Sequence, residues 1–272
     1  MYHVFKADGS KEAFSEEKVL DSIRRARIPQ INQSEVLNHV KSKLYDGIST
    51  AEIYRHITEF LDRSPHPYVT SRYNLKGAIM MLGPTGYPFE DFIAKLLTEL
   101  GYQTKVRQIL SGKCVSHEID VIAQKDGRTS MIEAKFHNSP GTRSEIHVAL
   151  YTEARFHDVK ARNELDDAWI VTNTKTTIDA NSYALCSGIK IISWNYPEGG
   201  SLRDLIEKAR LHPITALASL SQTNKAALLE NHITMCKEIN SNNAILDMLP
   251  LSKEEREKTL AEVEYICREE KA

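Results

Sequence analysis

Apolar and polar positions follow patterns along the chain that predict a sheet between flanking helices. Between residues 88 and 101, apolar side chains recur at intervals of three and four residues, the period of a helix with one buried face. Residues 102–106 alternate as a strand, and residues 168–173 and 189–194 are mostly apolar, as in strands covered on both faces. The helical pattern over 177–186 joins these last two strands and predicts a right-handed crossover with parallel pairing.

Two apolar-rich segments within residues 117–136 flank the dipeptide Asp126-Gly127. This dipeptide is a strong signal for a two-residue β-hairpin turn. The turn predicts that Lys125 pairs with Arg128, and this register continues back along both strands.

The same register places Asp120 opposite Glu133 and Glu118 opposite Lys135. Cross-strand partners point to one side of a sheet, so these four side chains are expected to form one cluster. Two facing carboxylates destabilise a sheet and are costly to bury, but a divalent cation such as Mg²⁺ removes the repulsion. The alternative is a surface hairpin whose charges pair across the strands, with Glu118 bonded to Lys135.

Asp120, followed by Glu133-Ala134-Lys135 on the next strand, resembles the PD-(D/E)xK motif of nucleases, specifically the Mrr-type branch of restriction endonucleases. The resemblance implies a metal-dependent endodeoxyribonuclease in which Asp120 and Glu133 bind Mg²⁺ or Mn²⁺. Lys135 would position the attacking water or stabilise charge on the phosphate. Glu118 is an auxiliary candidate.

The helix predicted over 88–101 extends this resemblance, because Phe89-Glu90 stand at its start and Leu100-Gly101-Tyr102 at its end. The resemblance implies that Glu90 reaches the metal site as an extra acid. A glutamate in the first turn of a helix is explained equally well by its favourable interaction with the helix dipole.

A basic helix is predicted over residues 143–163. Its cationic side chains are Arg143, Arg155, Lys160 and Arg162. Such a helix beside a metal site suits contact with the phosphodiester backbone of DNA, and a solvated face with acidic partners is the alternative. His137 and His147 lack a second ligand pair at metal spacing, so no zinc site is expected.

The first 83 residues predict a strand hairpin followed by four helices. Ser15 and Ser49 are expected to cap two of these helices, the second with Glu52 as the reciprocal partner of a capping box. The other two helices are predicted over 34–45 and 69–82.

This segment resembles an ATP cone, the regulatory nucleotide-binding domain at the front of ribonucleotide reductases and of their repressor. The matching residues are Val4, Lys6, Asp8, Gly9, Glu12, Phe14, Lys18, Tyr45 to Thr50, Glu52 and Ile53. The resemblance implies that ATP or dATP binds through Lys6, Glu12, Lys18 and Thr50, since lysines meet phosphates and a hydroxyl adds a hydrogen bond. Ala7 stands where the family often has arginine, so weak or absent nucleotide binding is the alternative.

Residues 212–272 predict helices only, the last over 252–271 with Ser252 as its cap. The sequence therefore predicts a multidomain fold of the α+β and α/β classes. It comprises an ATP-cone-like domain at 1–83, a mixed-sheet nuclease core with flanking helices at 87–211, and a helical C-terminal region at 212–272. Dimerisation and packing against the nuclease core are both open roles for the last region.

The net charge of −2 over 272 residues means that a DNA-binding surface has to come from local basic clusters. No apolar run is long enough to span a membrane, and the polar start of the chain predicts no signal peptide. The four cysteines lie far apart without a CxxC pair, which favours reduced thiols in a cytoplasm.

These features predict a Mg²⁺- or Mn²⁺-dependent DNA endonuclease that ATP or dATP regulates through the first domain. Cleavage of both DNA strands would favour a homodimer. Two alternatives belong to other classes: a catalytically idle, nucleotide-gated DNA-binding module, and a transcriptional regulator with the first domain as its sensor. The intact set of Asp120, Glu133 and Lys135 favours the enzyme, and no zinc ribbon accompanies the first domain as a regulator would suggest.

Overall fold

The computed structural model describes residues 2–26, 28, 30–64 and 68–268. The chain divides into two compact units. The first unit combines residues 1–78 with 212–228 and 235–272, and the second combines 79–211 with 229–234. The C-terminal region thus contributes to both units, and the three-part division at 1–83, 87–211 and 212–272 stays a prediction.

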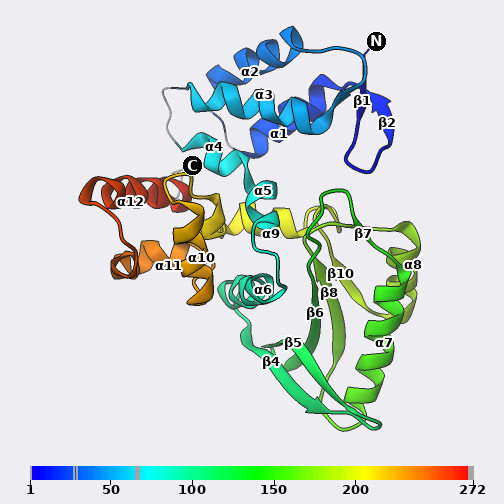
Figure 1. The fold of residues 1–272 in the computed structure, drawn as a ribbon. Coiled ribbons are helices and arrows are strands. Elements are labelled where there is room, and N and C mark those ends of the chain that lie inside the picture. The colour runs from blue at the N-terminus through cyan, green and yellow to red at the C-terminus, as the bar shows by residue number, and fades with distance from the viewer. Residues whose placement is uncertain (1, 27, 29, 65–67, 269–272) are drawn as a thin grey trace. The chain divides into compact units, whose positions relative to one another are not determined.

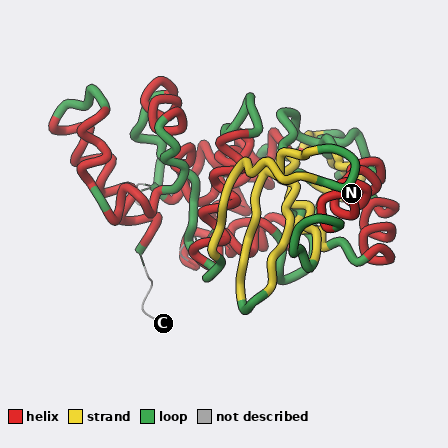
Figure 2. The backbone as a smooth tube through the Cα atoms, turned by 90° about the horizontal axis from the view of Figure 1, so that it is seen from below, coloured by secondary structure: helices red, strands yellow, loops and turns green. Residues whose placement is uncertain are grey.

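Five strands form the sheet of the second unit, in the order β10-β8-β6-β5-β4 (Figures 1 and 2). They are β4 (Gln103–Ser111), β5 (Ser116–Lys125), β6 (Arg128–Lys135), β8 (Asp167–Thr172) and β10 (Lys190–Ile192). Strands β4, β5 and β6 pair antiparallel, whereas β6, β8 and β10 pair parallel. The sheet is therefore mixed, as the apolar pattern predicts, and β6 lies at the junction of its two halves.

Helices flank this sheet on both faces (Figure 1). Helix α6 (Tyr87–Glu99) contacts β4, β5 and β6 and buries Phe89 and Phe92 completely. Helices α7 (Ile146–Lys160) and α8 (Ile178–Ser187) pack against each other and against β8 and β10, and α9 (Leu202–Ala209) follows β10 along the chain. Polar residues lie near β6, at strand ends that these helices do not cover.

The hairpin between β5 and β6 confirms the predicted turn. Asp126 and Gly127 have φ values of +50° and +75°, the left-handed conformation that both central residues of a type I′ turn require. The pairing runs from Lys125 with Arg128 to Val121 with Ile132. This is the register that the Asp-Gly dipeptide predicts.

The helix predicted over 143–163 is shorter than expected. Arg143 lies in a short strand, β7 (Arg143–Ser144), which pairs in parallel with β9 (Lys175–Thr176). The Ser144 carbonyl also accepts a hydrogen bond from the backbone of Thr177, so this segment is held beside β9 and the helix begins only at Ile146. The predicted strand at 102–106 is longer than expected and continues to Ser111.

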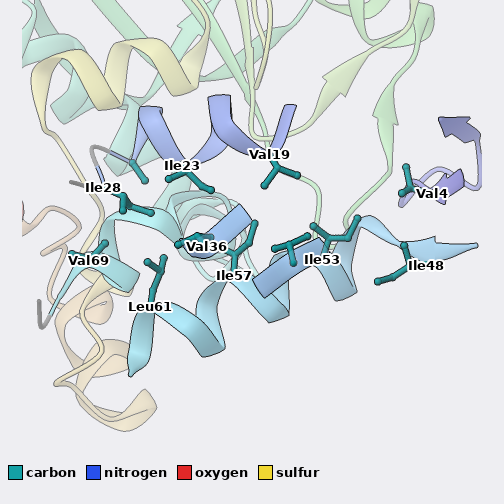
Figure 3. Close-up of a cluster of buried hydrophobic side chains, with 12 residues drawn as sticks. Val4, Val19, Ile23, Ile28, Val36, Ile48, Ile53, Ile57, Leu61 and Val69 are labelled. Carbon is teal, nitrogen blue, oxygen red and sulfur yellow. The ribbon is translucent and has the colours of Figure 1, made fainter. Parts of the chain in front are cut away.

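The first unit begins with a three-stranded sheet in the order β2-β1-β3, formed by β1 (His3–Phe5), β2 (Lys11–Ala13) and β3 (Ile48–Ser49). Its helices α1 (Glu16–Arg25), α2 (Gln30–Ser42) and α3 (Thr50–Asp62) enclose an aliphatic core (Figure 3). The core residues labelled in Figure 3 are Val4, Val19, Ile23, Ile28, Val36, Ile48, Ile53, Ile57, Leu61 and Val69.

Three helix predictions in this unit need correction. The helix predicted over 34–45 is α2, which begins at Gln30 and ends at Ser42. Ser49 caps α3 by accepting from the Glu52 backbone, but the Glu52 side chain accepts from the Tyr45 hydroxyl at 2.8 Å and completes no capping box. The single helix predicted over 69–82 is two helices, α4 (Val69–Tyr73) and α5 (Leu75–Met80). They meet at Asn74, whose side chain accepts from the Tyr54 hydroxyl at 2.6 Å.

The C-terminal region is helical, as predicted. Its elements are η1 (Ile214–Ala216), α10 (Gln222–Glu230), α11 (Cys236–Ser241), η2 (Asn243–Met248) and α12 (Lys253–Cys267). Ser252 caps α12 in a capping box with Glu255, and the predicted end of this helix at 271 lies outside the described residues. Within the described ranges, no helix has the length and apolarity needed to cross a membrane.

Candidate active site and nucleotide-binding pocket

Asp120 and Glu133 lie next to each other on β5 and β6, just beyond the last regular pair of the hairpin. The backbone N–H of Ala134 donates to Asp120 Oδ2 at 2.7 Å. The Asp120 side chain thus accepts from β6 at a point where the regular backbone pairing of β5 with β6 has ended. On the opposite edge of β6, Glu133 pairs with Ile170 of β8. The two carboxylates therefore sit where β5 starts to leave β6.

The electrostatics of Asp120 reflect this crowding. Burial and, second, the neighbouring charge of Glu133 together raise the pKa of Asp120 from 3.8 to about 7, against the lowering effects of the Ala134 N–H and Arg155. A carboxyl group that is destabilised as an anion by burial and by a second carboxylate gains from any cation placed between the two.

Arg155 of α7 is the cation nearest to Glu133. Its Nη1 lies 2.8 Å from Glu133 Oε2, and both side chains are largely buried, with 10% and 14% of their surface exposed. The contact has the distance of an ion pair without the angles of a hydrogen bond. Glu133 Oε2 and Arg155 Nε are both buried, and neither has a hydrogen-bond partner among the described residues.

Glu90 is held by an arginine at the edge of the same cluster. Arg107 of β4 reaches Glu90 Oε2 at 3.2 Å and Asp91 Oδ1 at 2.7 Å. Burial raises the pKa of Glu90, and the Arg107 guanidinium opposes this rise. Because the charge of Glu90 also raises the pKa of Asp120, the structure brings Glu90 into the electrostatic field of the acidic pair.

Arg107 itself has φ +50°, which is unusual for a residue within a strand. It lies between the pairs Val106–Val121 and Gln108–Ile119, at the level of Asp120. Backbone strain of this kind persists only where surrounding structure holds it, and it clusters at functional sites.

His232, from the C-terminal region, completes this arrangement. Its Nδ1 lies 2.7 Å from Asp91 Oδ2, so Asp91 is bonded to both Arg107 and His232. No sequence pattern had pointed to Arg107, Asp91 or His232 as part of the site. Asp91 directly follows Glu90 and could have been considered with it, whereas nothing local connects Asp91 to a histidine 141 positions away.

Lys135 and Glu118 are less closely associated with Asp120 and Glu133 than the predicted four-residue cluster implies. Lys135 lies two residues after Glu133 on β6 and pairs with Thr172 of β8. Among the described residues it forms no ion pair, which excludes the alternative bond to Glu118 for this structure. Glu118 is exposed, and its charge raises the pKa of Glu90.

The carboxylates of Asp120 and Glu133 are oxygen donors of the kind that hard divalent cations bind. Asp120 and Glu133 offer carboxylate oxygens, and the buried, unbonded Glu133 Oε2 is an acceptor that a cation would satisfy. No group of three or more His, Cys, Asp or Glu side chains at metal-binding spacing occurs in the described part of the chain. Two carboxylates match the protein ligands that Mg²⁺ usually takes, since waters fill the rest of its coordination shell.

The predicted nucleotide contacts gather at one cavity of the first unit. Glu12, Lys18 and Thr50 line a cavity of about 180 Å³, and Tyr54 and Tyr73 line it as well. The two tyrosine rings stack with centroids 5.0 Å apart. Tyr54 lies four residues after Thr50 on α3, a spacing that could have identified it, whereas Tyr73 had no comparable signal.

Glu12 connects both predicted phosphate-binding lysines. Lys6 Nζ and Lys18 Nζ lie 2.5 and 2.8 Å from Glu12 Oε2. Hydrogen bonds from Lys18 and Lys6 hold the pKa of Glu12 below its usual value. Lys6 does not line the cavity itself but contacts Glu12, which does. The ammonium groups of Lys6 and Lys18 therefore meet at the same carboxylate oxygen.

Family models match three segments of the chain: an ATP cone domain at residues 2–75, a restriction endonuclease domain at 83–197, and the C-terminal domain of AF1548-like proteins at 212–267. An uncharacterized protein of Archaeoglobus fulgidus is 37% identical over 175 residues, covering 64% of this chain and 99% of that protein.

Two solved structures are also similar to parts of the chain. The crystal structure of AF1548, a protein of unknown function, is 37% identical, with a TM-score of 0.58 over 67% of this chain and 98% of that one. The restriction endonuclease MspJI in complex with a 27-mer oligonucleotide is 14% identical, with a TM-score of 0.38 over 70% of this chain and 39% of that one.

The matches define the class of the protein as an ATP cone followed by a restriction-endonuclease domain of the Mrr type. More specifically, the chain belongs to the family of the Archaeoglobus fulgidus protein and carries the AF1548-like C-terminal domain.

Proposed function

We propose that the chain is a divalent-metal-dependent DNA endonuclease whose activity responds to ATP or dATP bound in the first unit. The observation that carries the proposal is the acidic pair: Asp120 has a raised pKa, and Glu133 has a buried oxygen without a hydrogen bond. The restriction-endonuclease and ATP cone matches support the reaction and its regulation.

In this proposal Asp120 and Glu133 hold Mg²⁺ or Mn²⁺, with a nearby main-chain carbonyl such as that of Ala134, and waters. The bound metal lowers the pKa of a water and neutralises charge on the scissile phosphate. Lys135 orients that water or stabilises charge on the phosphate. Glu90, fixed by Arg107, acts as the extra acid.

A catalytically idle DNA-binding module is the second candidate, since Arg155 satisfies part of the charge of Glu133 without any metal. One DNA fragment separates the two functions. Filter binding in EDTA measures affinity alone, and incubation in Mg²⁺ measures cleavage. Binding without cleavage under Mg²⁺, Mn²⁺ and added ATP or dATP would support the idle module.

Metal binding is expected to depend on pH through Asp120. Its folded-state pKa of about 7 means that a proton competes with the metal below that pH. The affinity for Mn²⁺ should therefore rise about tenfold per pH unit up to about pH 7 and level off above it. Titration calorimetry at pH 6, 7 and 8 measures this, and an affinity that does not change with pH would contradict it.

The same group gives a matching stability effect. Because its pKa is raised, Asp120 stabilises the folded state only while it holds its proton, so metal-free stability should fall as pH rises from about 4 through 7.

For the nucleotide, we propose that the phosphates of ATP or dATP bind Lys6 and Lys18 and that Thr50 adds a hydrogen bond. The two lysines would then exchange their ion pairs with Glu12 for contacts with the phosphates. Lys18→Ala is expected to weaken ATP binding about tenfold, because one charge-assisted contact is lost. Calorimetry with ATP and dATP measures this, with Lys11→Ala on the neighbouring strand as control. Equal affinities in both variants would remove Lys18 from the site.

We also propose that the active form on duplex DNA is a homodimer, because one such site cuts one strand. Sedimentation of the full chain with and without a DNA duplex tests this, and a monomer that makes double-strand breaks would contradict it.

A further inference from the structure

The contact between Arg155 and Glu133 is unusual because it places a permanent cation on a carboxylate of the proposed metal site. Glu133 Oε2 lies 2.8 Å from Arg155 Nη1. The same nitrogen donates to the Glu118 carbonyl at 3.3 Å, and the guanidinium carbon lies 4.5 Å from the centroid of the Tyr151 ring. These contacts hold Arg155 over the acidic pair from the side of α7.

The pairing is geometrically incomplete. Glu133 Oε2 and Arg155 Nε are buried without a hydrogen bond in the described part of the chain. An arginine whose role was only to join α7 to β6 would be expected to use its planar fork in a bidentate bond with the carboxylate. The observed single contact neutralises Glu133 but leaves its buried oxygen open to a better partner.

Arg155 also has space to move away from Glu133. Its side chain lines a surface hollow between α7 and the β4–β5 turn. The other residues of the hollow include Lys113, His117, Tyr151, His157 and Asp158. The Asp158 carboxylate in this hollow accepts hydrogen bonds from the backbone N–H groups of Cys114 and Val115. Its Oδ2 also lies 2.9 Å from His117 Nε2.

We propose that Arg155 is a positioning residue that serves as the internal counter-ion of Glu133: it neutralises this ligand while no metal is bound, and a divalent cation displaces it. The inference rests on the proposed function, because it assigns Glu133 to the metal. It follows that the site resists metal at low concentration, since binding has to break a largely buried ion pair.

Metal affinity tests this without reference to cleavage. Arg155→Gln removes the competing charge and leaves the acidic pair uncompensated, so Mn²⁺ should bind at least about tenfold more tightly at pH 8. Mn²⁺ should also raise the melting temperature of this variant more than that of the wild type. Calorimetry and thermal unfolding with Mn²⁺ alone, without DNA, give both values.

Two variants separate charge from packing. Arg155→Lys keeps a cation beside Glu133 and should retain an affinity close to that of the wild type. Arg128→Gln removes an exposed arginine on β6 that pairs with Asp167 at 3.0 Å, and it should leave Mn²⁺ affinity unchanged.

The outcomes distinguish this inference from the proposed function. Unchanged or weaker Mn²⁺ binding by Arg155→Gln, with normal binding by the wild type, would overturn the counter-ion role and leave the nuclease proposal in place. Failure of the wild type and of Arg155→Gln to bind Mn²⁺ would overturn both, because Glu133 would then have no metal to exchange for Arg155.

Discussion

Glu133→Gln is expected to lower metal-dependent DNA cleavage by roughly a thousandfold or more, while the second unit stays folded. The amide keeps the size of the side chain but removes the negative charge that holds the metal. It also relieves the repulsion of Asp120, which offsets part of the cost of leaving Arg155 without its ion-pair partner. Single-turnover cleavage of a labelled duplex in Mg²⁺, with circular dichroism on the same sample, measures both effects.

Glu164→Gln is the matched control, because this glutamate is exposed in the same unit and should retain full activity. Lys135→Ala then separates metal binding from chemistry. It should lose cleavage to a similar degree but bind Mn²⁺ with normal affinity, since Lys135 forms no ion pair with the acidic residues among those described. Full activity of Glu133→Gln would remove the acidic pair from the mechanism.

The second large effect is expected at Glu262, which has no exposed surface. Its carboxylate accepts from the backbone N–H groups of Ala218 and Ser219, each at 2.8 Å, and from the hydroxyl of Ser71. It thereby joins α12 to the segment after η1 and to α4. Glu262→Ala leaves these donors without an acceptor and should lower the free energy of unfolding of the first unit by about 3–5 kcal/mol.

Urea denaturation followed by far-ultraviolet circular dichroism measures this change. Both tryptophans, Trp169 and Trp194, lie in the second unit, so their fluorescence reports that unit alone. Glu257→Ala is the control, because Glu257 is exposed and its contact with Lys253 spans 3.9 Å; it should change the free energy by less than about 0.5 kcal/mol. A change that small in Glu262→Ala would show that its three bonds contribute little.

Local signals in the sequence were enough to predict the hairpin that carries the site. Asp126 and Gly127 adopt the turn that their residue types favour, and this turn fixes the pairing up to Val121 and Ile132. Beyond that point Asp120 takes the N–H of Ala134, a side-chain interaction that strand alternation does not encode. The register of β5 and β6 was therefore predictable wherever the backbone N–H and C=O groups of the two strands pair with each other.

Long-range contacts account for the features that the sequence did not predict. The basic pattern over 143–163 predicts that Arg155 faces either DNA or solvent, but α7 turns it toward Glu133, because helical period alone does not specify which neighbour a charged face meets. Residues 229–234 join the second unit because His232 binds Asp91, a contact between positions 141 apart. The helix predicted over 69–82 is interrupted at Asn74, whose side chain accepts from the Tyr54 hydroxyl, a contact that a local pattern does not show.

The proposed nucleotide pocket was predictable from the sequence only in part. Its likeness to an ATP cone identified Glu12, Lys18 and Thr50, which line one cavity. The sequence did not show that Lys6 and Lys18 share Glu12 as a partner, because that contact depends on how β1, β2 and α1 come together.

The most direct test of the central claim is nicking of supercoiled plasmid by the full chain, in Mg²⁺ or Mn²⁺ and in EDTA, each with and without ATP or dATP. The proposal predicts nicking that requires the metal, changes with the nucleotide, and disappears in Glu133→Gln. A folded protein that binds the plasmid but leaves it intact under every metal and nucleotide condition would contradict it.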